Sequence, residues 1–261
     1  MDRALWVAKT GLDGQQTRLA VIANNLANVT TTGYKRSNAV FEDLVYQNMR
    51  QVGAQSSQSS ILPSGLYLGT GTRIVATEKQ HVQGNLVQSG SNNDVAIEGR
   101  GFFQVSLPDG SLGYTRDGSF QLDADGQLVT SSGMPLSPAL TVPGDATSVS
   151  IGADGTVSVL TPGQATPTVI GSIQLADFVN PSGLEPVGKN LFKESAASGS
   201  PQVANPGENG TGTLLQGFTE ASNVNMVEEL VNMIEAQRAY EANSKAIQAS
   251  DQMMQFVTSN L

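Results

Sequence analysis

The residues that interrupt helices are concentrated in the middle of this 261-residue chain. All 11 prolines lie between Pro63 and Pro206, and 25 of the 28 glycines lie between Gly53 and Gly217. Because proline breaks a helix interior and glycine weakens one, the first 50 and last 42 residues lack the main barriers to helix formation. We predict two helical ends and a centre of strands and turns, which suits an assembly subunit better than an enzyme.

The N-terminal end carries apolar residues at intervals of three and four, a heptad-like stripe. Its members are Leu5, Ala8, Leu12, Leu19, Ile22, Leu26 and Val29. The helix should end at residues 30–33, because three β-branched threonines lower helix propensity and Gly33 can adopt the left-handed conformation of a helix cap. A shorter amphipathic segment follows over residues 40–49, and we expect it to belong to the helical end.

The C-terminal helix should begin near Asn225. With Asn225 as the N-cap, Glu228 falls at the third helical position, where it resembles a capping box and places acid at the positive end of the helix dipole. Two heptad lines then run along the helix. One contains Met226, Met233, Tyr240, Ile247 and Met254, and the other contains Leu230, Gln237, Ser244 and Asp251.

The middle of the chain alternates apolar and polar residues over short runs, as strands do. Four Asp-Gly pairs, which favour tight hairpins, begin at Asp109, Asp117, Asp125 and Asp154. We expect residues 102–129 to form an antiparallel meander within a sandwich, a barrel or several small sheets. Residues 51–65 are polar and of low complexity, and we expect them to be extended.

The predicted fold class is α+β, with coiled-coil-like terminal helices and a central, mainly antiparallel β-domain between them. We expect a discontinuous helical assembly domain over 1–50 plus 218–261, the extended segment over 51–65, and the β-domain over 66–217. The first 50 residues hold six basic and four acidic residues, whereas 220–261 hold two and six. Opposite charge favours pairing of the two ends, although exposed ion pairs contribute only about 0–1 kcal/mol each.

Composition argues against several other functions. The net charge of −9 argues against a nucleic-acid-binding surface, and the absence of cysteine excludes disulfides and thiolate metal sites. No cleavable signal peptide is recognisable, and no apolar run approaches the ~20 residues of a membrane span.

No catalytic, cofactor-binding or metal-binding residues are predicted. The single histidine, His81, is expected to be structural or exposed, and no nucleophile elbow or Walker A loop is present. Asp123-Ala124-Asp125-Gly126 has part of a calcium-loop pattern but lacks the downstream bidentate glutamate, so a hairpin turn is expected there. A secreted adhesin or carbohydrate-binding β-module remains an alternative, although the clustered aromatics that such a surface needs are missing.

The segment ANNLANVTTTGYKR, from Ala23 to Arg36, resembles the signature of the flagellar rod and hook axial proteins. Further blocks support the resemblance, and together they cover nearly the whole chain. These blocks are DVAIEGRGFFQV (94–105), YTRDGSFQLDADGQLV (114–129) and EELVNMIEAQRAYEANSKAIQASDQMM (228–254). Within the family, the chain length and the Gln/Ser-rich segment are most similar to subunits of the distal rod, with a proximal rod or hook subunit as the alternative.

The resemblance implies a structural subunit of the bacterial flagellar basal body, not an enzyme, that self-assembles into a hollow drive shaft around an export channel. It implies a location in the periplasm, reached through the flagellar type III export apparatus without a cleaved signal. The implied partners are further copies of the chain, proximal rod and hook-side axial proteins, and P-ring and L-ring proteins. No nucleic acid, membrane insertion or cofactor is implied.

The assembly interface is expected to combine the two terminal stripes with the amides of the signature. Buried amides can fix the register of packed helices, whereas the simpler interpretation of Asn24 and Asn28 is a solvated helix face. The candidate interface residues are Leu5, Leu12, Leu19, Ile22, Asn24, Asn25, Leu26, Asn28, Leu230, Met233, Ile234, Tyr240 and Ile247.

Overall fold

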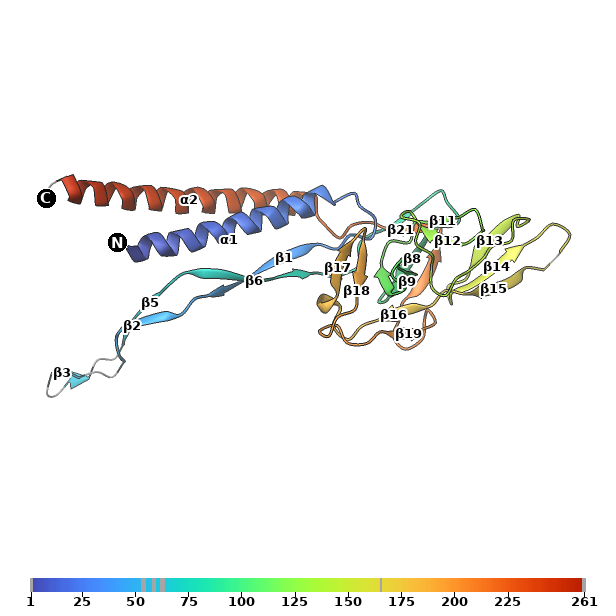
Figure 1. Cartoon of the computed structure of the whole chain (residues 1–261), viewed down its shortest axis with the longest axis horizontal. Coiled ribbons are helices and arrows are strands. Elements are labelled where there is room, and N and C mark those ends of the chain that lie inside the picture. Colours follow the sequence, from blue (N-terminus) through green and yellow to red (C-terminus); the bar gives the residue numbers. More distant parts are fainter. Residues whose placement is uncertain (1, 53–54, 58–59, 62–63, 165, 260–261) are drawn as a thin grey trace. The chain divides into compact units, whose positions relative to one another are not determined.

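The chain divides into two compact units in a computed structural model that describes residues 2–52, 55–57, 60–61, 64–164 and 166–259 (Figure 1). We call them the terminal unit and the central unit. The terminal unit comprises the described residues of Met1–Leu26, Ser37–Glu78 and Asn225–Leu261. The central unit comprises those of Ala27–Arg36 and Lys79–Val224. This division differs from the expected one, because residues 66–78 group with the two ends and residues 27–36 group with the β-rich centre.

Two long helices dominate the terminal unit, α1 (Asp2–Ala27) and α2 (Met226–Ser259). The cap predicted for α2 is confirmed, since the Asn225 side-chain oxygen accepts hydrogen bonds from the backbone N–H groups of Val227 at 3.1 Å and Glu228 at 3.5 Å. The helical stripe of α1 gives way to turns after Ala27, and Gly33 has a φ of +68° in the left-handed region. A side chain at Gly33 would also meet the Asp117 backbone nitrogen at 2.6 Å, so only glycine fits there.

The remainder of the terminal unit is built from paired strands (Figure 1). The pairs are β1 (Ser37–Asp43) with β6 (Thr72–Lys79), β2 (Tyr46–Arg50) with β5 (Leu66–Gly69), and β3 (Gln55–Ser57) with β4 (Ser60–Ile61). The amphipathic segment expected over residues 40–49 does group with the two helices, but it forms parts of strands β1 and β2 and not a helix. This stretch is rich in β-branched and aromatic residues, and its backbone partners come from residues 66–79, which the local pattern does not reveal.

The segment expected to be extended over 51–65 is only partly described. Its described portion contains the short β3–β4 pair, and residues 53–54, 58–59 and 62–63 lie outside the described residues. The function of this segment therefore stays a prediction.

Small antiparallel sheets make up the central unit, which agrees with the expected α+β class. The largest sheet has six strands in the order β17 (Glu185–Gly188), β18 (Leu191–Lys193), β10 (Leu112–Thr115), β9 (Phe102–Ser106), β16 (Leu175–Asp177), β19 (Gln202–Ala204). A three-stranded sheet follows the order β13 (Ser148–Ile151), β14 (Thr156–Leu160), β15 (Thr168–Ser172). Three strand pairs are β11 (Phe120–Leu122) with β12 (Leu128–Thr130), β20 (Thr213–Gln216) with β8 (Val95–Glu98), and β21 (Phe218–Glu220) with β7 (Leu86–Gln88). A 3₁₀ turn occupies Pro181–Gly183.

Two hydrophobic clusters form the core of the central unit. The larger one is mainly aliphatic and includes the alternating residues Val95, Ile97, Phe103 and Val105 that predicted these strands. The smaller one is mainly aromatic and contains Phe102, Tyr114, Ala176, Phe178, Leu184 and Phe192.

Three of the four Asp-Gly pairs behave as predicted, with positive φ angles at Gly110, Gly126 and Gly155. The fourth does not. Gly118 lies against the Val95 backbone oxygen, leaving no room for a side chain, and the Asp117 carboxylate accepts hydrogen bonds from Ser119. The stretch 102–129 therefore forms two separate hairpins, β9–β10 and β11–β12, and not one continuous meander.

Candidate functional site

The two terminal helices pack antiparallel along a line of small and polar residues. A Cβ atom added to Gly11 of α1 would lie 3.0 Å from Nδ2 of Asn243 on α2, so the two helices approach closely there. Nearer the other end of the pair, Asn25 of α1 lies 3.4 Å from the carboxylate of Glu229. On α2 these contact residues belong to one heptad line, Glu229, Ala236, Asn243 and Ser250, of which all but the half-buried Asn243 are buried.

This seam is not the one that the heptad pattern predicted for α2. The expected apolar residues Leu230, Ile234 and Tyr240 are exposed, whereas Met233 and Ile247 are half-buried. On α1 the expected stripe does face inward, with Ile22 buried and its apolar neighbours half-buried. Those neighbours are Leu5, Leu12, Leu19 and Leu26. The heptad line that contains Glu229 and Asn243 thus contacts α1 within one chain, whereas Leu230, Ile234 and Tyr240 of α2 lie outside this contact.

Large apolar side chains gather on the first turns of α2 and are exposed in the single chain. They are Met226, Val227, Leu230, Val231 and Ile234, and their spacing places them on one face of the helix. Contiguous exposed apolar surface of this kind marks an interaction site. Ile234, with half of its surface exposed, lies at the far end of this face, which we call the α2 apolar face.

Of the three signature amides, only Asn25 is buried. Its side-chain N–H donates to the Ser37 backbone oxygen at 2.8 Å, and its side-chain oxygen accepts from the Ser37 N–H at 2.9 Å. The amide therefore pairs with Ser37 as a neighbouring strand would, and it joins α1 to the start of β1. Asn24 is exposed and Asn28 is half-buried, and both make interactions of their own.

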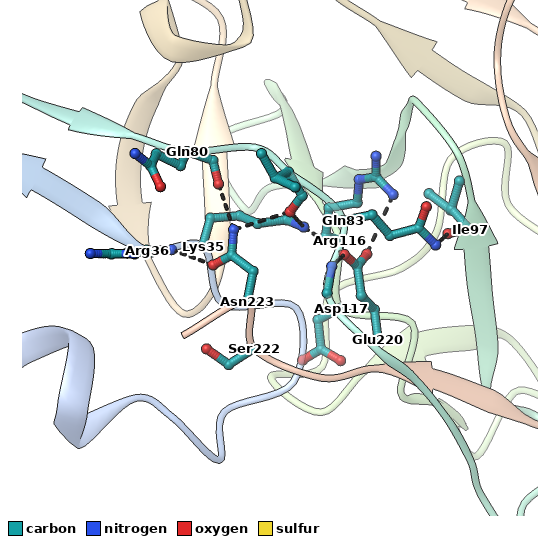
Figure 2. A network of polar contacts seen from close by, with 12 residues as sticks. Lys35, Arg36, Gln80, Gln83, Ile97, Arg116, Asp117, Glu220, Ser222 and Asn223 are labelled. Carbon is teal, nitrogen blue, oxygen red and sulfur yellow. Dashed lines mark hydrogen bonds and ion pairs between the residues drawn. The ribbon is translucent and has the colours of Figure 1, made fainter. Parts of the chain in front are cut away.

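A buried ionic cluster in the central unit joins parts of the chain that are far apart in sequence (Figure 2). The Lys35 ammonium lies 2.5 Å from Oε1 of Glu220, and an Arg116 nitrogen lies 3.3 Å from Oε2 of the same carboxylate. Lys35 and Glu220 have no exposed side-chain surface, and Arg116 is almost completely buried. We call these three residues the ionic junction.

The ionic junction is also bonded to the backbone around it. Oε1 of Glu220 accepts from the Gly84 N–H at 2.8 Å, and its backbone oxygen accepts from the Gly33 N–H at 2.8 Å. The Lys35 ammonium donates to the Val82 oxygen at 2.8 Å, and Arg116 donates to the Gly99 oxygen at 2.7 Å. Each of the three charged groups therefore has an ionic partner and at least one backbone hydrogen bond, as burial of charge requires, and only Nε of Arg116 lacks a partner among the side-chain atoms of these three residues.

Asn223 adds a second connection between the same segments (Figure 2). Its side-chain oxygen accepts from the Arg36 N–H at 2.7 Å, and its amide donates to the backbone oxygens of Gln80 at 2.8 Å and Val82 at 3.1 Å. The Gln80 N–H in turn donates to the Arg36 oxygen at 2.8 Å. Residues 33–36, 80–84 and 220–223 are thus held together by side chains and backbone.

Burial governs the electrostatics of this region. Burial lowers the pKa of Lys35 and the pKa of Arg116. The negative charge of Glu220 opposes both changes. Burial also lowers the pKa of Lys79, whose ammonium lies 4.8 Å from the centre of the Tyr34 ring. The single carboxylate of Glu220 is the anion that makes close ion pairs with Lys35 and Arg116.

The chain passes between the two units at four points, namely 26/27, 36/37, 78/79 and 224/225. On the terminal side, Asn25 and Ser37 bind one another beside the first two points. On the central side, Arg36, Gln80 and Asn223 bind one another beside the last three. All four passages are therefore fixed within a few residues of the point where the chain changes units.

Three family profiles match separate parts of the chain. They are described as "Flagella basal body rod protein" (residues 5–35), "Flagellar hook protein FlgE/F/G D1 domain" (96–159) and "Flagellar basal body rod FlgEFG protein C-terminal" (215–261). A protein from Buchnera aphidicola subsp. Acyrthosiphon pisum, named "Flagellar basal-body rod protein FlgG", is 58% identical over 252 residues, 97% of each chain. The chain belongs to the flagellar basal-body rod family. Proteins of the same name are 46% identical in Borreliella burgdorferi, over 97% of each chain, and 38% identical in Bacillus subtilis, over 98% of this chain and 97% of that one.

Each member of the ionic junction lies in a different matched region of this rod-family chain. Lys35 is the last residue of the first region, Arg116 lies in the second, and Glu220 lies in the third. Lys35 lies within the signature and Glu220 within the acidic C-terminal end, but the local sequence does not indicate that either residue is buried. No local signal could have shown it, since their pairing spans 185 positions.

His81 is structural in this rod-family protein, in line with expectation. Its ring packs edge-on against Phe102 and Phe192, with ring centres 5.4 and 5.3 Å away, and its pKa is lowered to about 4, chiefly by burial. Asp123–Gly126 forms a turn in which the Gly126 N–H donates to the Asp123 oxygen at 2.9 Å, as predicted. Within the described residues no group of three or more His, Asp or Glu side chains could hold a metal ion, and no helix has the length and apolar character needed to cross a membrane.

Proposed function

We propose that this chain is a structural subunit of the distal rod, a hollow shaft that transmits torque from the flagellar motor to the hook. Family membership gives the setting, and relatives named as rod proteins favour the rod over the hook. The proposal includes a periplasmic location, export without a cleaved signal, and no catalytic activity.

The α2 apolar face carries the proposal that the chain assembles with copies of itself. A single chain leaves Leu230 and Ile234 in water, although each such side chain gains about 1.5–3 kcal/mol when it is fully buried. The contacts of α2 with α1 lie on the line that contains Glu229 and Asn243, so Leu230 and Ile234 are available to neighbouring copies. In this arrangement the predicted coiled-coil packing occurs between chains, around the export channel.

The paired strands of the terminal unit supply a second surface for assembly. Exposed apolar and aromatic side chains cover both strands of the β2–β5 pair and the residue before it, namely Val45, Tyr46, Met49, Leu66, Tyr67 and Leu68. An isolated two-stranded pair is marginal in water, so contact with a neighbour would stabilise it. We infer that this pair and residues 51–65 join adjacent copies.

The four chain passages suit a subunit that carries mechanical load. Force applied to one unit reaches the other through four covalent connections, and Asn25, Asn223 and the ionic junction fix their ends. When an axial or ring partner pulls on one unit, the load is shared by four chain connections and does not fall on a single one. The proposed partners are proximal rod proteins, hook-side axial proteins, P-ring and L-ring proteins and the flagellar type III export apparatus.

Deleting the gene for this chain in its own host tests the proposal. The expected cells are non-motile, with basal bodies that lack the distal rod and the hook, and a plasmid copy of the wild-type gene restores both. Motile cells with complete rods would overturn it. Rods of normal length that lack only the hook would favour the alternative of a hook-side subunit.

A further inference from the structure

His81 occupies the centre of the segment that the ionic junction holds. The backbone groups of Gln80, Val82 and Gly84 bind Arg36, Asn223, Lys35 and Glu220, as described above. In the middle of this segment, the His81 ring packs edge-on against both Phe102 and Phe192, whose own ring centres lie 6.1 Å apart. Hydrogen bonds at residues 80, 82 and 84 therefore anchor the segment 79–84, and at its centre the His81 ring packs against two phenylalanine rings.

Both rings that hold His81 already lie beside a cation. The Arg116 guanidinium lies 5.4 Å from the centre of the Phe102 ring, and the Lys79 ammonium lies 5.9 Å from the centre of the Phe192 ring. Both ring nitrogens of His81 are buried and have no hydrogen-bond partner among the described residues. The site thus accepts a neutral imidazole and offers nothing to a protonated one.

The charged groups around His81 come from several elements. Lys79 is on its own segment, Lys35 and Arg116 are in the ionic junction, and Glu220 is already shared by those two. Strand β9, which carries Phe102, has no charged residue, and Lys193 of β18 lies 3.6 Å from the Asp109 carboxylate. A proton on His81 would therefore add a positive charge to a group with one carboxylate for three cations.

We propose that residues 79–84 form an acid-sensitive latch, in which protonation of His81 expels its ring from the aromatic cluster and loosens the bonds at the ionic junction. This inference goes beyond the proposed function and does not depend on it. At neutral pH the latch is closed. In acid, ejection of His81 shifts the backbone groups of Gln80, Val82 and Gly84 away from Asn223, Lys35 and Glu220.

The sign of the effect follows from proton linkage. The pKa of His81 is lower in the folded chain, at about 4, than the 6.5 of an unperturbed histidine, so the unfolded chain binds more protons between these values. Stability is therefore full above pH 6.5 and falls as the pH drops towards 4. Between pH 7 and pH 5, His81 alone should lower the folding equilibrium constant of the central unit roughly 20-fold.

The chain contains one histidine, so its titration can be followed without assignment of other signals. In the full-length wild-type protein, the NMR signal of the imidazole should titrate with a midpoint near pH 4, or remain neutral until acid unfolding begins. A midpoint near 6.5 in the folded protein would overturn the latch, because the proton would then enter without resistance.

Denaturant unfolding of the full-length protein at pH 7 and pH 5 separates His81 from the acidic residues. His81→Phe keeps an aromatic ring against Phe102 and Phe192 but cannot titrate. Between pH 7 and pH 5 the folding equilibrium constant of the wild type should therefore fall about 20-fold more than that of His81→Phe. An identical loss in wild type and His81→Phe would contradict the proposal. Because a larger ring could prevent folding, His81→Leu provides a second non-titrating variant.

Hydrogen exchange tests whether the opening is local. After correction for intrinsic exchange rates, peptides covering 30–36 and 79–84 should lose protection between pH 7 and pH 5 in the wild type. Peptides covering β13 and β14, in the same unit, report unfolding of the whole unit: their protection should fall by no more than about 20-fold and stay well above the protection of 79–84 at pH 5. Equal protection of the two regions at pH 5, or no loss in 79–84, would overturn a local latch.

Discussion

Lys35 and Glu220 lie 185 positions apart in sequence, yet their charged groups meet at 2.5 Å with no exposed side-chain surface. Lys35 lies in the signature segment after the end of α1, and Glu220 ends the last strand before α2. Their ion pair, completed by Arg116, therefore connects the segment that leaves α1 with the segment that leads into α2. Its value lies in holding these segments together, because buried ion pairs add little net stability over apolar residues of similar volume.

Breaking this pair from one side should be strongly destabilising. Lys35→Met leaves the Glu220 carboxylate buried with only Arg116 as a cationic partner, and the expected loss is about 3–5 kcal/mol. Denaturant unfolding of the full-length protein at pH 7 measures it. The matched control is Arg73→Met, which breaks an exposed pair with Glu42 at 2.8 Å and should cost less than about 1 kcal/mol. Equal losses in the two variants would show that the junction contributes no more than a surface pair.

Replacing the buried amide of α1 should loosen the first two chain passages. Asn25→Leu removes both hydrogen bonds to Ser37 and leaves two backbone groups without their partner, at a cost of about 1–3 kcal/mol each. Thermal unfolding followed by helical circular dichroism reports the change. Gln16→Leu, an exposed amide on the same helix, is the control and should change stability by less than about 0.5 kcal/mol. A neutral Asn25→Leu would argue that water replaces the amide there.

The close approach of the helices should not tolerate a large side chain at Gly11. Gly11→Leu raises helix propensity by up to about 1 kcal/mol, but its side chain would occupy the space of Asn243 and force α1 and α2 apart. The expected result is a lower melting temperature of the helices despite the better propensity. Ala20→Leu, at an exposed position of α1, should leave the melting temperature unchanged or slightly higher. Equal changes in melting temperature for Gly11→Leu and Ala20→Leu would show that α1 and α2 do not approach closely at Gly11.

Substitution on the α2 apolar face should separate assembly from folding. Ile234→Asn replaces a half-exposed side chain and should change the stability of the single chain by no more than about 0.5 kcal/mol. If neighbouring copies bury this face, the same variant should reduce rod formation and motility severely, as counted on electron micrographs and swarm plates. Gln248→Asn, an exposed polar position on α2, is the control and should keep both. Normal rods with Ile234→Asn would remove this face from the interface.

Residues 54–61 should stiffen the rod. Deleting them should leave both units able to fold and to be exported, yet give rods that bend more easily, because contacts between neighbouring copies are lost. Persistence length measured on micrographs of isolated rods is the readout. An alternating Gly/Ser segment of the same length is the control for spacing, and it should also give flexible rods if the native side chains make the contacts. Unchanged stiffness in both variants would reduce this segment to a passive linker.

Local sequence patterns predicted the elements whose causes are local. The cap at Asn225, the two long helices, the alternating core strands and three of the four Asp-Gly turns all follow from properties of a few adjacent residues. Residues 40–49 form strands and not a helix, because their apolar spacing suits more than one element and the partner strands come from residues 66–79. The Asp117-Gly118 pair was misjudged because the Val95 backbone, and not the turn itself, fixes Gly118.

The candidate site divides in the same way. Heptad spacing identified α1 and α2 as the paired elements. The contacts of α2 with α1, Glu229 and Asn243, lie on a line that also carries the buried Ala236 and Ser250, and hydrophobicity alone does not select this line. The sequence left open whether the signature amides are buried or form a solvated helix face; Asn25 is buried, because its amide satisfies two backbone groups of Ser37. Lys35, Arg116 and Glu220 could not be predicted as a cluster, because charged residues are usually exposed and their pairing depends on the finished fold.

A cryo-electron microscopy map of the rod assembled from this chain tests the central claim most directly. The account predicts that α1 and α2 line the channel, and that Leu230 and Ile234 of each copy are buried against the helices of neighbouring copies. Asn25, the ionic junction and Asn223 should keep their contacts within each chain. A map in which Leu230 and Ile234 face solvent, and copies join only through their central units, would contradict it.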